Sequence, residues 1–124
     1  MSGFYDGVDG RRTYRFPAAT LSAAATVGRI QGPAGKVGRV VGLEYVLTLG
    51  TTVAVTNVSV DTVAGLTAPV SVAIPVLAIN LGGAAAAAEL KAGDELPADT
   101  VANVDTDGGC TAGAGDLIVT VQWY

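Results

Sequence analysis

The sequence contains no histidine and only one cysteine among its 124 residues. Without histidine, the Ser-His-Asp and Cys-His catalytic arrangements, imidazole acid–base chemistry and histidine-containing metal sites are all excluded. Serine and threonine then have only carboxylates as candidate bases. The single cysteine, Cys110, allows no intramolecular disulfide and is interpreted as a small loop residue. We therefore expect no enzyme, no cofactor and no metal centre.

Charged residues are scarce and unevenly spread. Residues 1–39 hold six cations against Asp6 and Asp9, whereas the remainder holds Lys91 against nine acidic residues. The balances are +4 and −8, which add to the net charge of −4. Nucleic-acid binding favours a domain that is basic overall, so no nucleic-acid partner is expected. The basic front instead fits an acidic protein surface, or the acidic body of a neighbouring copy.

Long hydrophobic segments of the kind that cross membranes are also missing. Residues 62–88 carry no charge, but Pro69, Pro75, Asn80 and two consecutive glycines interrupt them. Their alternating pattern is typical of a strand, a turn and a second strand, so we expect no transmembrane helix and no membrane partner. The first residues contain no apolar stretch of a secretory signal, which predicts synthesis in the cytoplasm.

Alanine, valine and glycine dominate the sequence, a composition that suits short strands and tight turns. At the C-terminal end, Leu117, Val119, Val121 and Trp123 alternate with Ile118, Thr120, Gln122 and Tyr124. This period of two predicts a half-buried strand whose first set of residues faces the core. Burial of the only tryptophan would tie this end of the chain down.

The clearest strand prediction covers residues 37–49. Its odd-numbered positions are expected to face the core: Val37, Arg39, Val41, Leu43, Tyr45, Leu47 and Leu49. The alternation changes phase between Val55 and Val58, which predicts a bulge or a tight turn near Asn57. Pro75 places the strand before it at a sheet edge or a bulge. The run of five alanines that ends before Glu89 predicts either a two-turn helix or a loop.

The segment "NVDTDG" has alternating oxygen ligands. Asn103, Asp105 and Asp107 followed by Gly108 match the first half of a calcium loop, but Ala114 stands where the bidentate glutamate belongs. We interpret the segment as an Asp-Gly turn between two strands and leave a bound cation there open.

Strands recurring about every ten residues, with glycine, proline, asparagine and aspartate between them, predict an all-β protein. The expected fold is a single antiparallel β-sandwich or a barrel, jelly-roll-like, over residues 17–124, preceded by an extended N-terminal arm over residues 1–16.

Four of the seven aromatic residues and three arginines lie within the first sixteen positions. Aromatic and arginine side chains dominate protein–protein hot spots. The predicted partner-binding residues are Phe4, Tyr5, Arg11, Arg12, Tyr14, Arg15 and Phe16. The alternative is that these residues form a loose tail and a first strand that completes the sheet.

Several segments resemble the head decoration, or cement, proteins of tailed bacteriophages. They are "GRIQGPAGKVGRVVGLEYVLTLG", the connector "LKAGDELPADT" and the terminal "LIVTVQWY", and the resemblance spans about residues 28–124. It implies a β-sandwich or jelly-roll module without catalytic residues, located on the capsid surface of the virion. The implied partners are the major capsid protein and, in a homotrimer, further copies of the chain. The alternative function is a receptor- or glycan-binding β-module of a virion or cell surface.

Overall fold

Eight strands and one short helix follow one another in the computed structural model, which describes residues 10–124. The elements are β1 (Arg11–Thr20), β2 (Ala24–Ile30), β3 (Gly38–Leu49), β4 (Thr56–Thr62), β5 (Val70–Ile74), β6 (Gly82–Ala84), α1 (Ala87–Ala92), β7 (Ala102–Asp107) and β8 (Ala114–Trp123).

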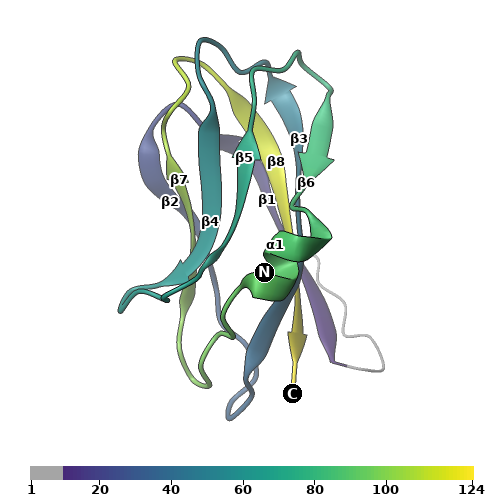
Figure 1. Ribbon diagram of the computed structural model, residues 1–124, viewed down its shortest axis with the longest axis vertical. Coiled ribbons are helices and arrows are strands. Elements are labelled where there is room, and N and C mark those ends of the chain that lie inside the picture. The colour runs from purple at the N-terminus through teal and green to yellow at the C-terminus, as the bar shows by residue number, and fades with distance from the viewer. Residues whose placement is uncertain (1–9) are drawn as a thin grey trace.

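The strands form two four-stranded antiparallel sheets that pack face to face (Figure 1). One sheet has the order β1-β8-β3-β6 and the other has the order β2-β7-β4-β5. The first strand therefore pairs with the last, and β2 pairs with β7. The predicted all-β antiparallel sandwich is confirmed.

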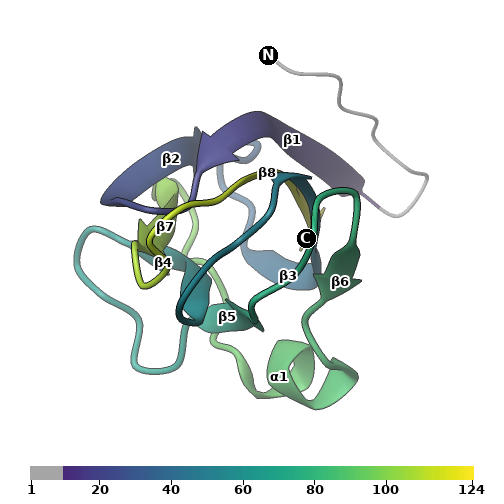
Figure 2. The same ribbon diagram turned by 90° about the horizontal axis from the view of Figure 1, so that it is seen from above.

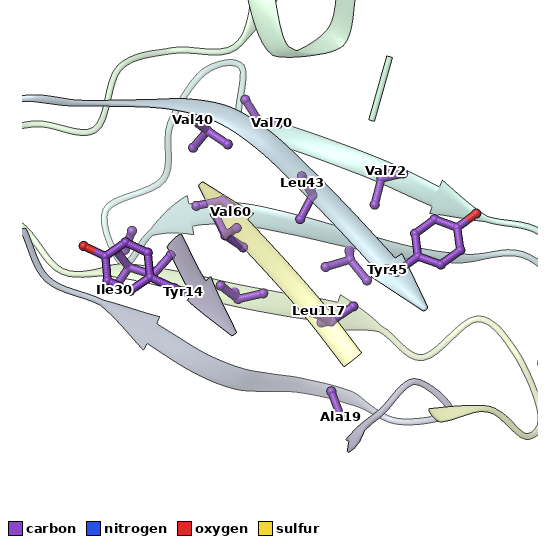
Figure 3. Packing of buried hydrophobic residues seen from close by; sticks show 14 of the residues in the cluster. Tyr14, Ala19, Ile30, Val40, Leu43, Tyr45, Val60, Val70, Val72 and Leu117 are labelled. Atoms are coloured by element: carbon purple, nitrogen blue, oxygen red, sulfur yellow. The ribbon is translucent and has the colours of Figure 1, made fainter. Parts of the chain in front are cut away.

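The core lies between the sheets and is built by the period-two alternation of the strands. Side chains from both sheets, among them Leu43, Tyr45, Val60, Val72 and Leu117, meet in this layer (Figure 3). In β8, the predicted inward set from Leu117 to Trp123 is buried, while the residues between them are only partly buried. Burial of such aliphatic side chains is the main favourable term in folding.

The inward face of β3 departs from strict alternation. Leu43, Tyr45 and Leu47 are buried as predicted, but Val40 is buried in place of Val41. A register shift between Val40 and Gly42 in the pairing with β8 explains the change of phase. The prediction was also wrong at Arg39, which lies between the buried Gly38 and Val40 and is only half-buried, and at Leu49, which is 52% exposed at the end of the strand.

Neither of the two predicted alternatives, a bulge or a tight turn, occurs at Asn57. Asn57 is an ordinary residue of β4, and Val58 and Val60 are buried behind it. Val53 and Val55 belong instead to the loop that precedes β4, where both side chains are exposed. The phase change thus marks the beginning of a strand.

Pro75 follows directly after β5, which is the outermost strand of its sheet, so the predicted edge position is confirmed. The alanine-rich run enters a helix only in part: Ala84 ends β6, α1 begins at Ala87, and no side chain caps its first turn. In the part of the chain that the structure describes, no helix has the length and apolarity needed to span a membrane.

Trp123 anchors the end of the C-terminal strand β8 in the core. Its side chain is 5% exposed, and the indole Nε1 donates a hydrogen bond of 3.1 Å to the Tyr14 hydroxyl in β1. A Cβ added at Gly32 or Gly38 would come within 2.5 Å of the indole ring. These glycines let the backbone approach the ring closely, so the end of β8 is part of the core.

Candidate interaction surfaces

Five of the seven predicted partner-binding residues lie in β1. Phe4 and Tyr5 lie outside the described residues. Strand β1 pairs with β8 from Arg11 to Phe16 and, after a register shift, again from Ala19 to Thr20. Residues 11–16 are therefore part of the sandwich, and the strand passes through the predicted domain boundary at residue 16.

The aromatic side chains of β1 point into the molecule. Tyr14 is buried in the core, and Phe16 is half-buried against Gly28, where an added Cβ would come within 2.2 Å of the ring. Successive residues of a strand face opposite sides, so these even-numbered positions share the inward face. The Tyr14 side chain therefore packs within the fold and does not form part of the surface.

Arg11, Thr13 and Arg15 occupy the outward face of β1. The Arg15 guanidinium forms an ion pair of 2.6 Å with the Asp116 carboxylate of β8. The Ala18 N–H also donates to that carboxylate, and these two hydrogen bonds lower the pKa of Asp116. The ion pair fixes the outer edge of the sheet at the bulge that follows Phe16.

Arg11 and Arg39 lie on either side of Gln122 on the outward face of this sheet. Both arginines are register partners of Gln122, Arg11 from β1 and Arg39 from β3. Because neighbouring strands are 4.7–4.9 Å apart, the two arginine Cα atoms are separated by about 10 Å. We call these three residues the basic row. The proximity of Arg39 to the N-terminal arginines could not be predicted from the sequence alone.

Four loops form a second surface at one end of the sandwich, and no sequence pattern predicted it. The loops are residues 21–23, 50–55, 75–81 and 108–113. They meet at the end opposite the C-terminus, the top of Figure 1 and the end facing the viewer in Figure 2. We call this surface the loop end. None of its four loops contains a charged residue.

Large apolar side chains gather at and beside the loop end. Among residues 10–124, nine large hydrophobic side chains are exposed, and seven of them belong to loops 50–55 and 75–81 or to the adjoining end of β3. They are Val46, Leu49, Val53, Val55, Val76, Ile79 and Leu81. Backbone hydrogen bonds from Leu47 to Leu81 and from Thr51 to Leu77 join these segments side by side. Monomeric proteins rarely expose large contiguous apolar patches.

Three threonines fasten the loops to one another. The Thr51 hydroxyl donates to the Pro75 carbonyl and accepts from the Leu77 N–H, at 2.7 and 2.8 Å. The Thr52 hydroxyl accepts a hydrogen bond from the Ala112 N–H. Thr56 is completely buried and connects the loops 21–23 and 108–113. Its hydroxyl donates to the Leu21 carbonyl and accepts from the Cys110 N–H.

Asp107 stabilises the border of the loop end. Its carboxylate accepts hydrogen bonds from the backbone N–H and side-chain amide of Asn57, at 2.9 and 2.7 Å, and from the Gly109 N–H. The two Asn57 bonds are the main reason why the pKa of Asp107 lies below its ordinary value. Asp107 ends β7, and Gly108 begins a six-residue connection to β8, longer than the tight turn that we expected.

The lowered pKa predicts a pH-dependent contribution to stability. Because the folded-state pKa lies below the unfolded value of 3.8, ionised Asp107 stabilises the fold above that value, and the contribution disappears as the pH falls through the folded-state pKa. We expect Asp107→Asn to lower the melting temperature by a few degrees at pH 7. The difference from the wild type should vanish in acid. A difference that stays constant from pH 7 to pH 2 would contradict this role.

The candidate cation ligands do not converge. Asn103, Asp105 and Asp107 alternate along the extended strand β7, so neighbouring members are about 6.5 Å apart along the chain. Asp105 accepts a hydrogen bond from Thr26, and Asp107 accepts from Asn57. Among the described residues, no group of three or more cysteine, aspartate or glutamate side chains is placed to hold a metal ion.

The basic row and the loop end are thus the two candidate interaction surfaces of the protein. One is charged and lies on a sheet face, and the other is uncharged and lies at the end of the sandwich. Comparison of the chain with protein-family models, curated proteins and solved structures finds no match.

Proposed function

We propose that this protein is a non-enzymatic structural protein of a bacteriophage virion. In this proposal it sits on the outside of the capsid as a homotrimer and stabilises contacts between major capsid subunits. Neither nucleic acid nor a membrane is a proposed partner. The resemblance of its segments to head decoration proteins motivates the proposal.

We further propose that the sandwich is a jelly roll. The strand order supports this assignment, because β1 pairs with β8, β2 pairs with β7, and the first four strands alternate between the two sheets. Eight strands connected as two Greek keys define the jelly roll, an architecture found in viral capsid and lectin domains. The fold leaves the function open, so the functional argument needs a surface.

The observation that carries the proposed function is the basic row. Arg11 and Arg39 stand on the outward face of a sheet whose other face is packed into the core. Guanidinium groups form paired hydrogen bonds with carboxylates, which suits an acidic protein surface such as a capsid subunit. Phe4 and Tyr5, upstream of β1, are proposed to extend this contact as an N-terminal arm.

Removal of the basic row is expected to weaken attachment to capsids. The double variant Arg11→Ala/Arg39→Ala should bind shells of the phage that encodes the protein about 2- to 30-fold less tightly at low salt, since exposed charge pairs contribute about 0.2–1 kcal/mol each. Its binding should also depend less on salt than that of the wild type, because screening acts on exposed charges. Co-sedimentation with shells that lack the protein, over a range of salt concentrations, measures both effects.

Arg29→Ala is the matched control. Arg29 is an exposed arginine of β2, in the other sheet, and its removal changes the net charge without touching the basic row. We expect its attachment to follow the wild type. Equal weakening by Arg29→Ala and by a single Arg39→Ala variant would assign the effect to net charge and contradict the basic row as the contact. Absence of any shell binding by the wild type would contradict the proposed function itself.

A further inference from the structure

We infer that copies of this chain associate with one another through the loop end. The inference names the surface for the self-association that the proposed function includes. It rests on the distribution of charge over the molecule, on the exposed apolar side chains and on the hydrogen bonds that hold the loops.

The distribution of charge favours a second copy as the occupant of the loop end. Each copy carries a net charge of −4, so copies repel one another unless their acidic surfaces stay apart. Asp61 and Asp105 lie on the outward face of the sheet β2-β7-β4-β5, and Asp94, Glu95 and Asp99 lie in the connection between α1 and β7. Contact between the same acidic faces of neighbouring copies at either place would set carboxylates against carboxylates.

The loop end is free of this repulsion. Its four loops contain no charged residue, and the acidic residues at its border already have partners. Asp107 is hydrogen-bonded to Asn57, and Asp116 is paired with Arg15. Copies whose loop ends meet around a threefold axis therefore place no unpaired carboxylates opposite each other within the contact.

The apolar side chains supply the attraction. Val53 is 78% exposed at the tip of the loop between β3 and β4, and Val76 and Ile79 are exposed in the neighbouring loop. A contact between identical subunits must be complementary to itself or to a second patch of the same subunit. An uncharged apolar surface meets this condition, because it needs no opposite charge on the partner. Exposed apolar patches of this kind mark association sites.

The loop end is also pre-organised for binding. Thr51, Thr52 and Thr56 join the four loops through hydrogen bonds to backbone groups of loops distant in sequence. Little additional ordering is needed when the loops meet a partner, and this lowers the entropic cost of association.

Analytical ultracentrifugation of the full chain without shells tests the inference. We expect the wild type to show the mass of a trimer, three times 12.3 kDa, at tens of micromolar. Val53→Asp should raise the dissociation constant at least about tenfold, because it places a carboxylate in the apolar contact. Val63→Asp is the matched control: Val63 is 87% exposed in the connection between β4 and β5, at the other end of β4. It should leave the mass unchanged.

Circular dichroism separates loss of association from loss of folding, and both variants should keep the wild-type spectrum. A wild-type mass of 12.3 kDa at all concentrations would overturn the inference, and so would equal effects of Val53→Asp and Val63→Asp. A monomeric wild type that still binds shells would overturn the inference and leave the capsid function standing. An oligomer that depends on Val53 but does not bind shells would support the inference and refute the capsid function.

Discussion

Replacement of Trp123 by alanine is expected to lower the free energy of unfolding by about 3–5 kcal/mol, the typical cost of truncating a large buried aromatic side chain. The indole is almost fully buried against Gly32 and Gly38, and the cavity left behind would be bordered by backbone that has no side chain to fill it. The Tyr14 hydroxyl would also lose its donor. Because whole domains are stable by about 5–15 kcal/mol, this single change removes a large part of the total.

Urea denaturation followed by far-UV circular dichroism measures the effect, since the variant has no tryptophan for fluorescence. Tyr124→Ala is the control: the Tyr124 side chain is 54% exposed, and the backbone hydrogen bonds between Tyr124 and Val37 remain. Its change should stay within about 0.5 kcal/mol. A loss of less than 1 kcal/mol for Trp123→Ala would show that the end of β8 is not needed for the core.

Replacement of Thr56 by valine is expected to lower the free energy of unfolding by about 2–4 kcal/mol. Valine matches the shape of threonine but cannot replace the hydroxyl, so two buried hydrogen bonds are lost together. The Cys110 N–H loses its acceptor at 2.9 Å, and the Leu21 carbonyl keeps only the weaker Cys110 Sγ–H donor at 3.3 Å. Each unsatisfied buried polar group costs about 1–3 kcal/mol.

Hydrogen exchange and denaturation together test this prediction. We expect faster exchange of the Cys110 amide in Thr56→Val, because the loop that follows β7 loses its attachment to β4. Thr48→Val is the control, since Thr48 is an exposed residue of β3. If both variants are equally stable, the buried hydroxyl does not hold the loop end together.

For the predicted partner-binding residues, the strand could be predicted from the sequence, but the direction of each side chain could not. The alternation "RRTYRF" was sufficient to predict a strand, and β1 contains it. Composition alone, however, grouped Tyr14 with the arginines as contact residues, whereas pairing with β8 turns Tyr14 inward against Trp123. Arg39 belongs beside Arg11 only because β1 and β3 are both neighbours of β8.

Local patterns determined the elements of this protein, and strand order determined its surfaces. The period-two alternation identified the inward set of β8 and most of that of β3, because alternate residues of any strand must face opposite sides. It could not reveal the phase shift after Val40, which arises where β3 bulges against β8. The loop end could not be predicted from local sequence patterns at all. At least nineteen residues separate consecutive loops along the chain, and only the pairing of distant strands brings their exposed apolar side chains to one end of the sandwich.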